Sequence, residues 1–127
     1  MIRLPMVLAL CGLLVLAGCR RGNDDLPAPD VPVHLMVHNG YGQPMEIFVS
    51  GESIDQRMGI VNPGMTGRFT VPRNLVGIGA VEVRAVPPGA ARSNQVARVG
   101  DLHLTSGVLI EFEIATPLFN STARILR

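Results

Sequence analysis

The sequence contains no lysine, so its positive charge rests on eleven arginines, which face ten acidic side chains. Arg3 belongs to the apolar leader described below, and without it the chain carries ten arginines and ten acids. Nucleic-acid binding requires an excess of positive charge on one face to neutralise phosphates. The balance argues against a nucleic-acid partner and provides no long-range electrostatic attraction for charged ligands.

A hydrophobic run long enough to cross a bilayer is also missing. The apolar run from Leu4 to Leu16 spans 13 residues, whereas a transmembrane helix needs about 20. A positive start at Arg3, a short apolar stretch and the small residues Ala17 and Gly18 are typical of a secretory signal. The sequence therefore predicts export and removal of residues 1–18.

Cysteine is scarce, with two in the chain, and the position of Cys19 is informative. The tetrapeptide that ends at Cys19, Leu-Ala-Gly-Cys, resembles the lipobox of bacterial lipoproteins, a resemblance that covers residues 1–19 only. It implies that the thiol of Cys19 carries a lipid such as a palmitate-containing diacylglycerol. Cys11 would leave with the signal, so the mature chain would keep no thiol for a disulfide, a metal site or a nucleophile.

We predict that residues 19–30 form a lipidated anchor and a flexible tether, because they are polar, rich in proline and poor in apolar side chains. Extended proline-rich chain spans about 3.1 Å per residue, so a dozen residues could hold a domain roughly 35 Å from the lipid surface. Lipoproteins of the inner membrane often resemble a pattern with Asp after the lipidated cysteine, and Arg20 takes that place here. We expect an outer-membrane anchor with the domain in the periplasm.

From Val31 onward the apolar residues recur with a period of two, which is typical of half-buried strands. The first predicted strand places four apolar side chains on one face, namely Val31, Val33, Leu35 and Val37. The clearest predicted strand lies near the C-terminus and points four apolar side chains inward, namely Val108, Ile110, Phe112 and Ile114. Further strands are predicted over residues 45–50, 56–61, 66–71, 81–85 and 95–100, and the sequence leaves open an eighth strand after Pro117.

Turn residues separate these strands, notably Asn39-Gly40, Asn62-Pro63-Gly64 and Pro87-Pro88-Gly89. No stretch combines a 3.6-residue apolar period with a cap at each end, so we expect no long helix. Residues 31–127 therefore predict one all-β domain, an antiparallel β-sandwich of about seven strands. Its shape would resemble immunoglobulin-like or transthyretin-like modules, an analogy that does not settle function.

His34-Leu35-Met36-Val37-His38 is the one pattern that suggests a metal, because imidazole and thioether suit copper. On a strand the two histidines would sit about 13 Å apart. Each imidazole reaches an ion only about 6 to 7 Å from its own Cα. The pair could not share an ion without distorting the strand, so we predict no metal site and no cofactor.

The materials of a hydrolytic triad are present in Asp101, His103 and scattered serines, but no nucleophile motif places them together. Glu111 and Glu113 would lie about 6.6 Å apart on one strand face, a spacing that suits paired-carboxylate chemistry. Their alternation with apolar residues favours a solvated outer face instead. We therefore predict no catalytic residue.

The C-terminal tail contains apolar Phe119, Ile125 and Leu126, which we interpret as a docked last strand in preference to an exposed adhesive segment. Together these features predict a lipid-anchored, non-enzymatic binding or assembly module with a protein partner in the envelope. Two other functions stay open: a periplasmic carrier of a small ligand or of copper, and an envelope enzyme whose site is not recognisable. The sequence does not predict the oligomeric state.

Overall fold

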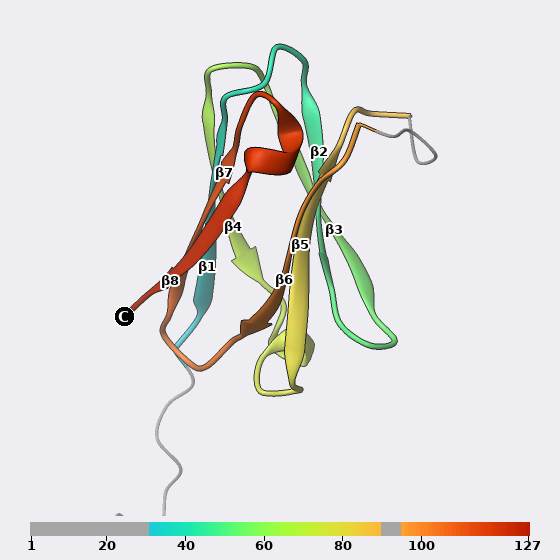
Figure 1. Ribbon diagram of the computed structural model, residues 1–127. Coiled ribbons are helices and arrows are strands. Elements are labelled where there is room, and N and C mark those ends of the chain that lie inside the picture. The colour runs from blue at the N-terminus through green and yellow to red at the C-terminus, as the bar shows by residue number, and fades with distance from the viewer. Residues whose placement is uncertain (1–30, 90–94) are drawn as a thin grey trace, which may run out of the picture.

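The protein is described by a computed structural model over residues 31–89 and 95–127. In these residues eight strands form two four-stranded sheets that pack face to face (Figure 1). The strands are β1 (Val33–Asn39), β2 (Met45–Ser50), β3 (Asp55–Val61), β4 (Thr66–Val71), β5 (Ala80–Val86), β6 (Ala97–His103), β7 (Leu109–Ile114) and β8 (Thr122–Leu126). Two short 3-10 turns, η2 (Arg73–Leu75) and η3 (Leu118–Asn120), complete the described structure.

The predicted all-β sandwich is confirmed, and the eighth strand that the sequence left open is β8. No long helix occurs within residues 31–89 and 95–127, as predicted. The predicted signal, Cys19 and the tether lie outside the described residues.

The strand order is β4-β1-β7-β8 in one sheet, here called sheet A, and β3-β2-β5-β6 in the other, sheet B. An immunoglobulin domain instead places its first, second, fifth and fourth strands in one sheet. The observed order therefore differs from that of an immunoglobulin domain, although the β-sandwich architecture is as predicted.

One strand pair departs from the predicted antiparallel arrangement, because β1 and β7 are parallel. The chain reverses direction at each connection between strands, so all odd-numbered strands run the same way. The remaining neighbours combine an odd with an even strand and are antiparallel. The β1–β7 pair joins two odd strands and is therefore parallel.

The core lies between the two sheets and is built from the alternating apolar positions that the sequence indicates. The largest fully buried side chains include Phe112, Leu35, Met45, Ile47 and Ile110. Phe112 and Ile110 of β7 are both 0% exposed, which confirms the predicted register of that strand. Burial of this apolar face provides the main favourable free energy of folding.

The first strand begins two residues later than predicted, because Val31 is 54% exposed and lies outside β1. Proline has no N–H to donate to a neighbouring strand, so Pro32 cannot extend the pairing. The N–H of Val31 donates instead to the hydroxyl of Ser106 at 2.8 Å. The predicted strand over residues 95–100 is likewise displaced and is found as β6, which runs on to His103.

The sandwich has two ends. At the proximal end the described chain begins at residue 31, and β1 starts nearby (Figure 1). At the opposite, distal end lie η3 and the connections formed by residues 40–44 and 62–65 (Figure 1).

Candidate partner-binding surface

The histidine pattern of the first strand lies on the outer face of sheet A, away from the core. Nδ1 of His38 lies 3.0 Å from Oγ1 of Thr66, and Nδ1 of His34 lies 3.5 Å from Oγ1 of Thr70. His103 is on β6, which belongs to sheet B. In the part of the chain that the structure describes, no group of three or more His, Cys, Asp or Glu side chains lies close enough together to hold a metal ion.

The acidic pair of β7 also lies on this outer face. Oε2 of Glu111 accepts a hydrogen bond from Nε of Arg124 at 2.7 Å and lies 2.6 Å from its Nη2. Glu113 is exposed and stands opposite His38 on β1 and Thr122 on β8. The carboxylates thus have different surroundings: Glu113 is exposed, as predicted for a solvated face, whereas the side chain of Glu111 is only 23% exposed and is paired with a guanidinium.

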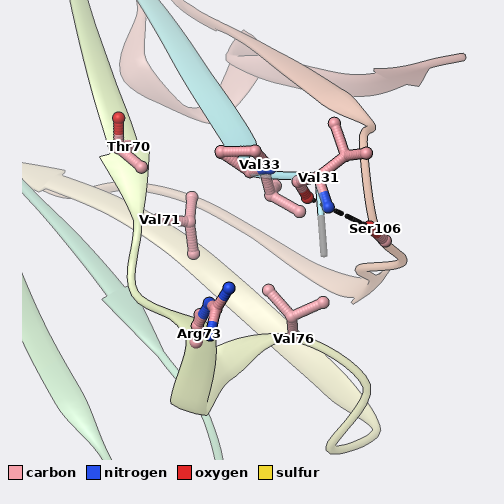
Figure 2. A pocket seen from close by; sticks show the side chains of 8 residues that line it. Val31, Val33, Thr70, Val71, Arg73, Val76 and Ser106 are labelled. Atoms are coloured by element: carbon pink, nitrogen blue, oxygen red, sulfur yellow. Dashed lines mark hydrogen bonds between the residues drawn. The ribbon is translucent and has the colours of Figure 1, made fainter. Parts of the chain in front are cut away.

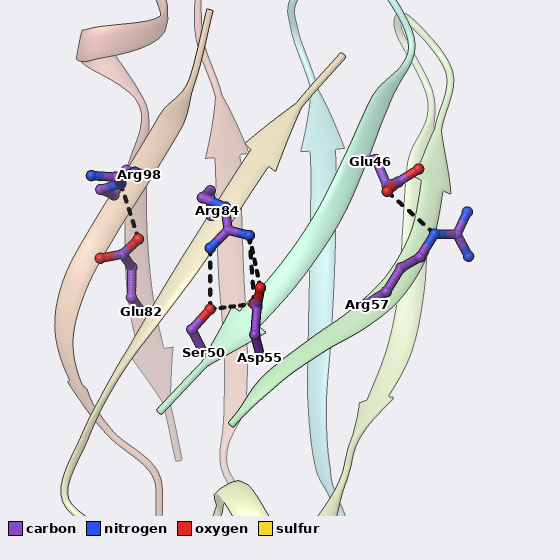
Figure 3. Close-up of polar contacts among 7 residues, drawn as sticks. All are labelled: Glu46, Ser50, Asp55, Arg57, Glu82, Arg84 and Arg98. Carbon is purple, nitrogen blue, oxygen red and sulfur yellow. Dashed lines mark hydrogen bonds and ion pairs between the residues drawn. The ribbon is translucent and has the colours of Figure 1, made fainter. Parts of the chain in front are cut away.

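The outer face of sheet B carries ion pairs that run across its strands (Figure 3). Arg57 pairs with Glu46 at 3.4 Å, and Arg98 pairs with Glu82 at 3.0 Å. Each pair joins neighbouring strands, so opposite charges neutralise each other across the sheet. This face therefore offers little net charge to a ligand.

Arg84 contacts three side chains of the same sheet, and Figure 3 shows two of them, Ser50 and Asp55. Its guanidinium lies 3.2 Å from the carboxylate of Asp55, donates to the hydroxyl of Ser50 at 3.2 Å, and stacks 4.7 Å from the ring centroid of Phe48. The pKa of Asp55 is lowered, first by the hydrogen bond that the Ser50 hydroxyl donates at 2.6 Å and then by Arg84, against an opposing effect of desolvation. These contacts hold the edge strand β3 to β2 and β5.

A pocket of about 310 Å³ opens at the proximal end (Figure 2). Its wall is mostly apolar and includes Val31, Val33, Val71 and Val76. The side chain of Arg73, on η2, points into this pocket (Figure 2). The arrangement suits a small amphipathic molecule, because ligand pockets combine apolar walls with a few polar groups.

The distal end is held together by a buried asparagine. Asn39 is 0% exposed and continues the inward alternation of β1. Its Nδ2 donates to the carbonyls of Gln43 at 2.8 Å and Val61 at 2.9 Å, while its Oδ1 accepts from the N–H of Tyr41 at 2.9 Å. One side chain therefore connects the β1–β2 loop to the end of β3 in the other sheet.

The same loops are joined to the connection between β7 and β8. The N–H of Gly40 donates to the carbonyl of Ile114 at 2.8 Å, and the hydroxyl of Thr116 donates to the carbonyl of Gly40 at 3.0 Å. A Cβ on Gly40 would lie 2.7 Å from that Ile114 carbonyl oxygen, so this close approach requires glycine. The predicted turn at Asn39-Gly40 thus forms part of a rigid framework.

Phe119 projects from this framework into solvent. It is 84% exposed, more than any other large hydrophobic residue in the part of the chain that the structure describes. Its neighbour Leu118 packs against the core, and the N–H of Ser121 closes the turn on the carbonyl of Leu118 at 3.1 Å. The turn is thereby fixed at Leu118 while the adjacent ring points outward. Met65, 59% exposed, belongs to the same end of the sandwich.

The exposed ring corrects one prediction. Ile125 and Leu126 are half-buried in β8, as a docked last strand requires, but Phe119 lies before that strand and is not docked. Pro117, two residues before Phe119, is the sequence signal that Phe119 belongs to a turn and not to the last strand. The sequence-based prediction also did not include Asn39 among the inward side chains, although Asn39 continues the period of two that starts at Val33.

No family model and no curated protein matches this chain. Among the described residues there is no helix of the length and hydrophobicity that a membrane span requires.

Proposed function

We propose that the protein is a lipid-anchored envelope lipoprotein, attached through Cys19 to the outer membrane, whose periplasmic β-sandwich is a non-enzymatic binding or assembly module. The partner is an envelope protein with an apolar recess, and it binds the distal end of the domain around Phe119. The single observation that carries this proposal is the 84% exposure of an aromatic ring on a turn that the core holds in place.

An exposed phenylalanine on a fixed turn is a suitable anchor for a protein partner. Aromatic residues are enriched at protein interfaces, and full burial of such a side chain contributes about 1.5 to 3 kcal/mol. The ring needs no large rearrangement before binding, because the backbone around it is already hydrogen-bonded. A preorganised anchor lowers the entropic cost of association.

The position of this surface fits the proposed anchor. A tether of residues 19–30 would reach the domain at the proximal end, and η3 lies at the opposite end (Figure 1). The turn that carries the exposed ring would then lie at the end of the domain that is farther from the membrane. A partner in the periplasm could approach it without obstruction from the lipid surface.

The experiment places a photo-crosslinking amino acid at position 119 in the full chain, expressed in its native envelope. The matched control places the same amino acid at Ile78, which is 47% exposed but lies in the connection before β5, outside the distal end. We expect one defined adduct from position 119 and none from position 78. In addition, Phe119→Ser should abolish co-purification of the captured protein without changing the urea midpoint.

Equal adducts from both positions, or full retention of the partner by Phe119→Ser, would contradict the proposed surface. If Phe119→Ser lost the partner and also had a lower urea midpoint, the loss would be explained by misfolding and not by the missing ring. The variant Leu118→Ala, which removes the buried neighbour of the ring, shows how such a folding defect would look.

The proximal pocket supports a second candidate function, carriage of a small amphipathic ligand. Its volume of about 310 Å³ is at the lower end of the range for ligand pockets. Native mass spectrometry of the protein extracted from its envelope should then reveal a bound small molecule. Val76→Trp, which fills the pocket, should release that molecule, whereas Phe119→Ser should retain it.

A further inference from the structure

The outer face of sheet A brings together a thioether, an imidazole and a carboxylate. They border a shallow hollow of about 190 Å³, whose wall includes Met36, His38 and Glu113. Glu113 is exposed and forms no ion pair within residues 31–89 and 95–127. Side chains of these three types are ligands of transition metals.

The strand register places the three side chains around one point. Met36 and His38 are two residues apart on the outward side of β1, so their Cα atoms lie about 6.6 Å apart. Glu113 stands opposite His38 in the parallel β1–β7 pair, across a strand spacing of about 4.8 Å. An imidazole reaches an ion about 6 to 7 Å from its own Cα, and methionine and glutamate have a similar reach. One ion above the sheet therefore lies within reach of all three.

The contact with Thr66 orients the histidine for such a role. Nδ1 of His38 lies 3.0 Å from Oγ1 of Thr66 on β4, and β1 lies between β4 and β7. Nε2 occupies the other side of an imidazole ring from Nδ1, so it is turned toward β7 and Glu113. If Nδ1 keeps its proton and donates to the hydroxyl, Nε2 carries the lone pair that binds a metal. Metal-binding histidines usually have such a hydrogen bond at their second ring nitrogen.

The other histidine and glutamate of this face lack these features. His34 stands opposite Leu109 and not a carboxylate, and its Nδ1 lies 3.5 Å from the hydroxyl of Thr70, which is long for a hydrogen bond. The carboxylate of Glu111 is already held by Arg124. Of the two pairs, only the one at His38 has an oriented imidazole beside an unpaired carboxylate.

We propose that Met36, His38 and Glu113 bind a Cu²⁺ ion on the outer face of sheet A. Nε2 of His38 and the Glu113 carboxylate are its main ligands, the Met36 thioether is the third, and water completes the coordination. Copper is favoured over zinc, because it binds a given N/O/S site more tightly and accepts a thioether. The prediction of no metal site rested on the about 13 Å between His34 and His38, whereas this site needs only one histidine.

The full chain, extracted in detergent from its native envelope, is titrated with copper sulfate against glycine as a competing chelator. We expect one Cu²⁺ per chain, with an electron paramagnetic resonance spectrum that shows a single coordinated imidazole. His38→Asn and Glu113→Gln should each lower the affinity by more than the roughly tenfold that loss of a supporting hydrogen bond costs. The matched controls, His34→Asn and Glu52→Gln in the β2–β3 loop, should keep the parent affinity.

Thr66 is a positioning residue in this site, because it acts on the ion only through His38. Thr66→Val keeps the shape of the side chain and removes the hydroxyl, so the Cu²⁺ affinity should fall about tenfold or more. The urea midpoint measured without copper should not change. Thr70→Val, the same change beside His34, should leave the affinity as it is.

Met36→Leu tests the third ligand. Because zinc does not favour a thioether, this variant should lose severalfold more affinity for Cu²⁺ than for Zn²⁺. Full retention of copper by His38→Asn or Glu113→Gln, loss of copper in His34→Asn, or equal effects of Thr66→Val and Thr70→Val would overturn the proposal. So would a loss of binding that occurs only in variants whose urea midpoint without copper is lowered.

Discussion

Asn39 of sheet A donates a hydrogen bond through Nδ2 to the carbonyl of Val61 in sheet B, at 2.9 Å and at a site closed to solvent. The two sheets otherwise meet through apolar side chains, so this bond adds a directional polar link at the distal end. It also sets the loop geometry beneath the proposed partner-binding surface.

Loss of this asparagine should destabilise the domain. We expect Asn39→Ala to cost about 1 to 3 kcal/mol, because the Tyr41 N–H and two carbonyls lose their partner at a buried site. Asn39→Asp should be at least as harmful, since it removes both donors and introduces a charge. Urea unfolding provides the measurement, and the exposed neighbour His38→Ala, expected within about 0.5 kcal/mol of the parent, is the control.

Phe112 should contribute far more to stability than its neighbour Glu113. Phe112 is 0% exposed between the sheets, and Phe112→Ala should cost about 3 to 5 kcal/mol through lost burial and an unfilled cavity. Glu113→Ala should change stability by less than about 0.5 kcal/mol, because the carboxylate is exposed. Equal shifts of the two urea midpoints would be incompatible with the β7 register.

Cys19 should carry the lipid that the lipobox resemblance implies. Cys19→Ala is expected to accumulate as an unprocessed precursor that takes up no labelled fatty acid, because the thiol is the acceptor. Gel mobility and incorporation of labelled palmitate measure both steps. Cys11→Ala should be processed and labelled normally, and undiminished labelling of Cys19→Ala would refute the assignment.

The Asp55 carboxylate should make stability depend weakly on acid pH. Its pKa is lower in the folded protein than the ordinary value of 3.8, first because of the Ser50 hydroxyl and then because of Arg84. The stabilisation is therefore present above the unfolded pKa and is lost as the pH falls through the folded pKa. Because the side chain of Asp55 is 56% exposed, we expect no more than about 1 kcal/mol.

A carboxylate-detected NMR titration measures this pKa directly. Ser50→Ala should raise the pKa of Asp55 toward its ordinary value, since it removes the shortest hydrogen bond to that carboxylate. Urea midpoints of Asp55→Asn should show a correspondingly flatter dependence on pH below about pH 4, near the unfolded pKa of Asp. An unchanged pKa in Ser50→Ala would show that Arg84 alone is responsible.

Local pattern determined most of the fold. Val33, Leu35 and Val37 are buried because a strand points alternate side chains to one face, and the same period at Ile110 and Phe112 predicts β7. The turn at Asn62-Pro63-Gly64 was also predictable, because Gly64 supplies the positive φ, 74°, that the turn requires. These features depend on residues close to one another in the sequence.

Which strands become neighbours was decided only by the tertiary structure. The parallel β1–β7 pair, the bond from Asn39 to Val61 and the pocket beside Arg73 each join residues that are far apart in the chain. The exposure of Phe119 belongs to the same class, because it depends on Leu118 packing against the core. An apolar period of two reports which face of a strand is buried, but it carries no information about the strand that lies beside it or the loop that covers it.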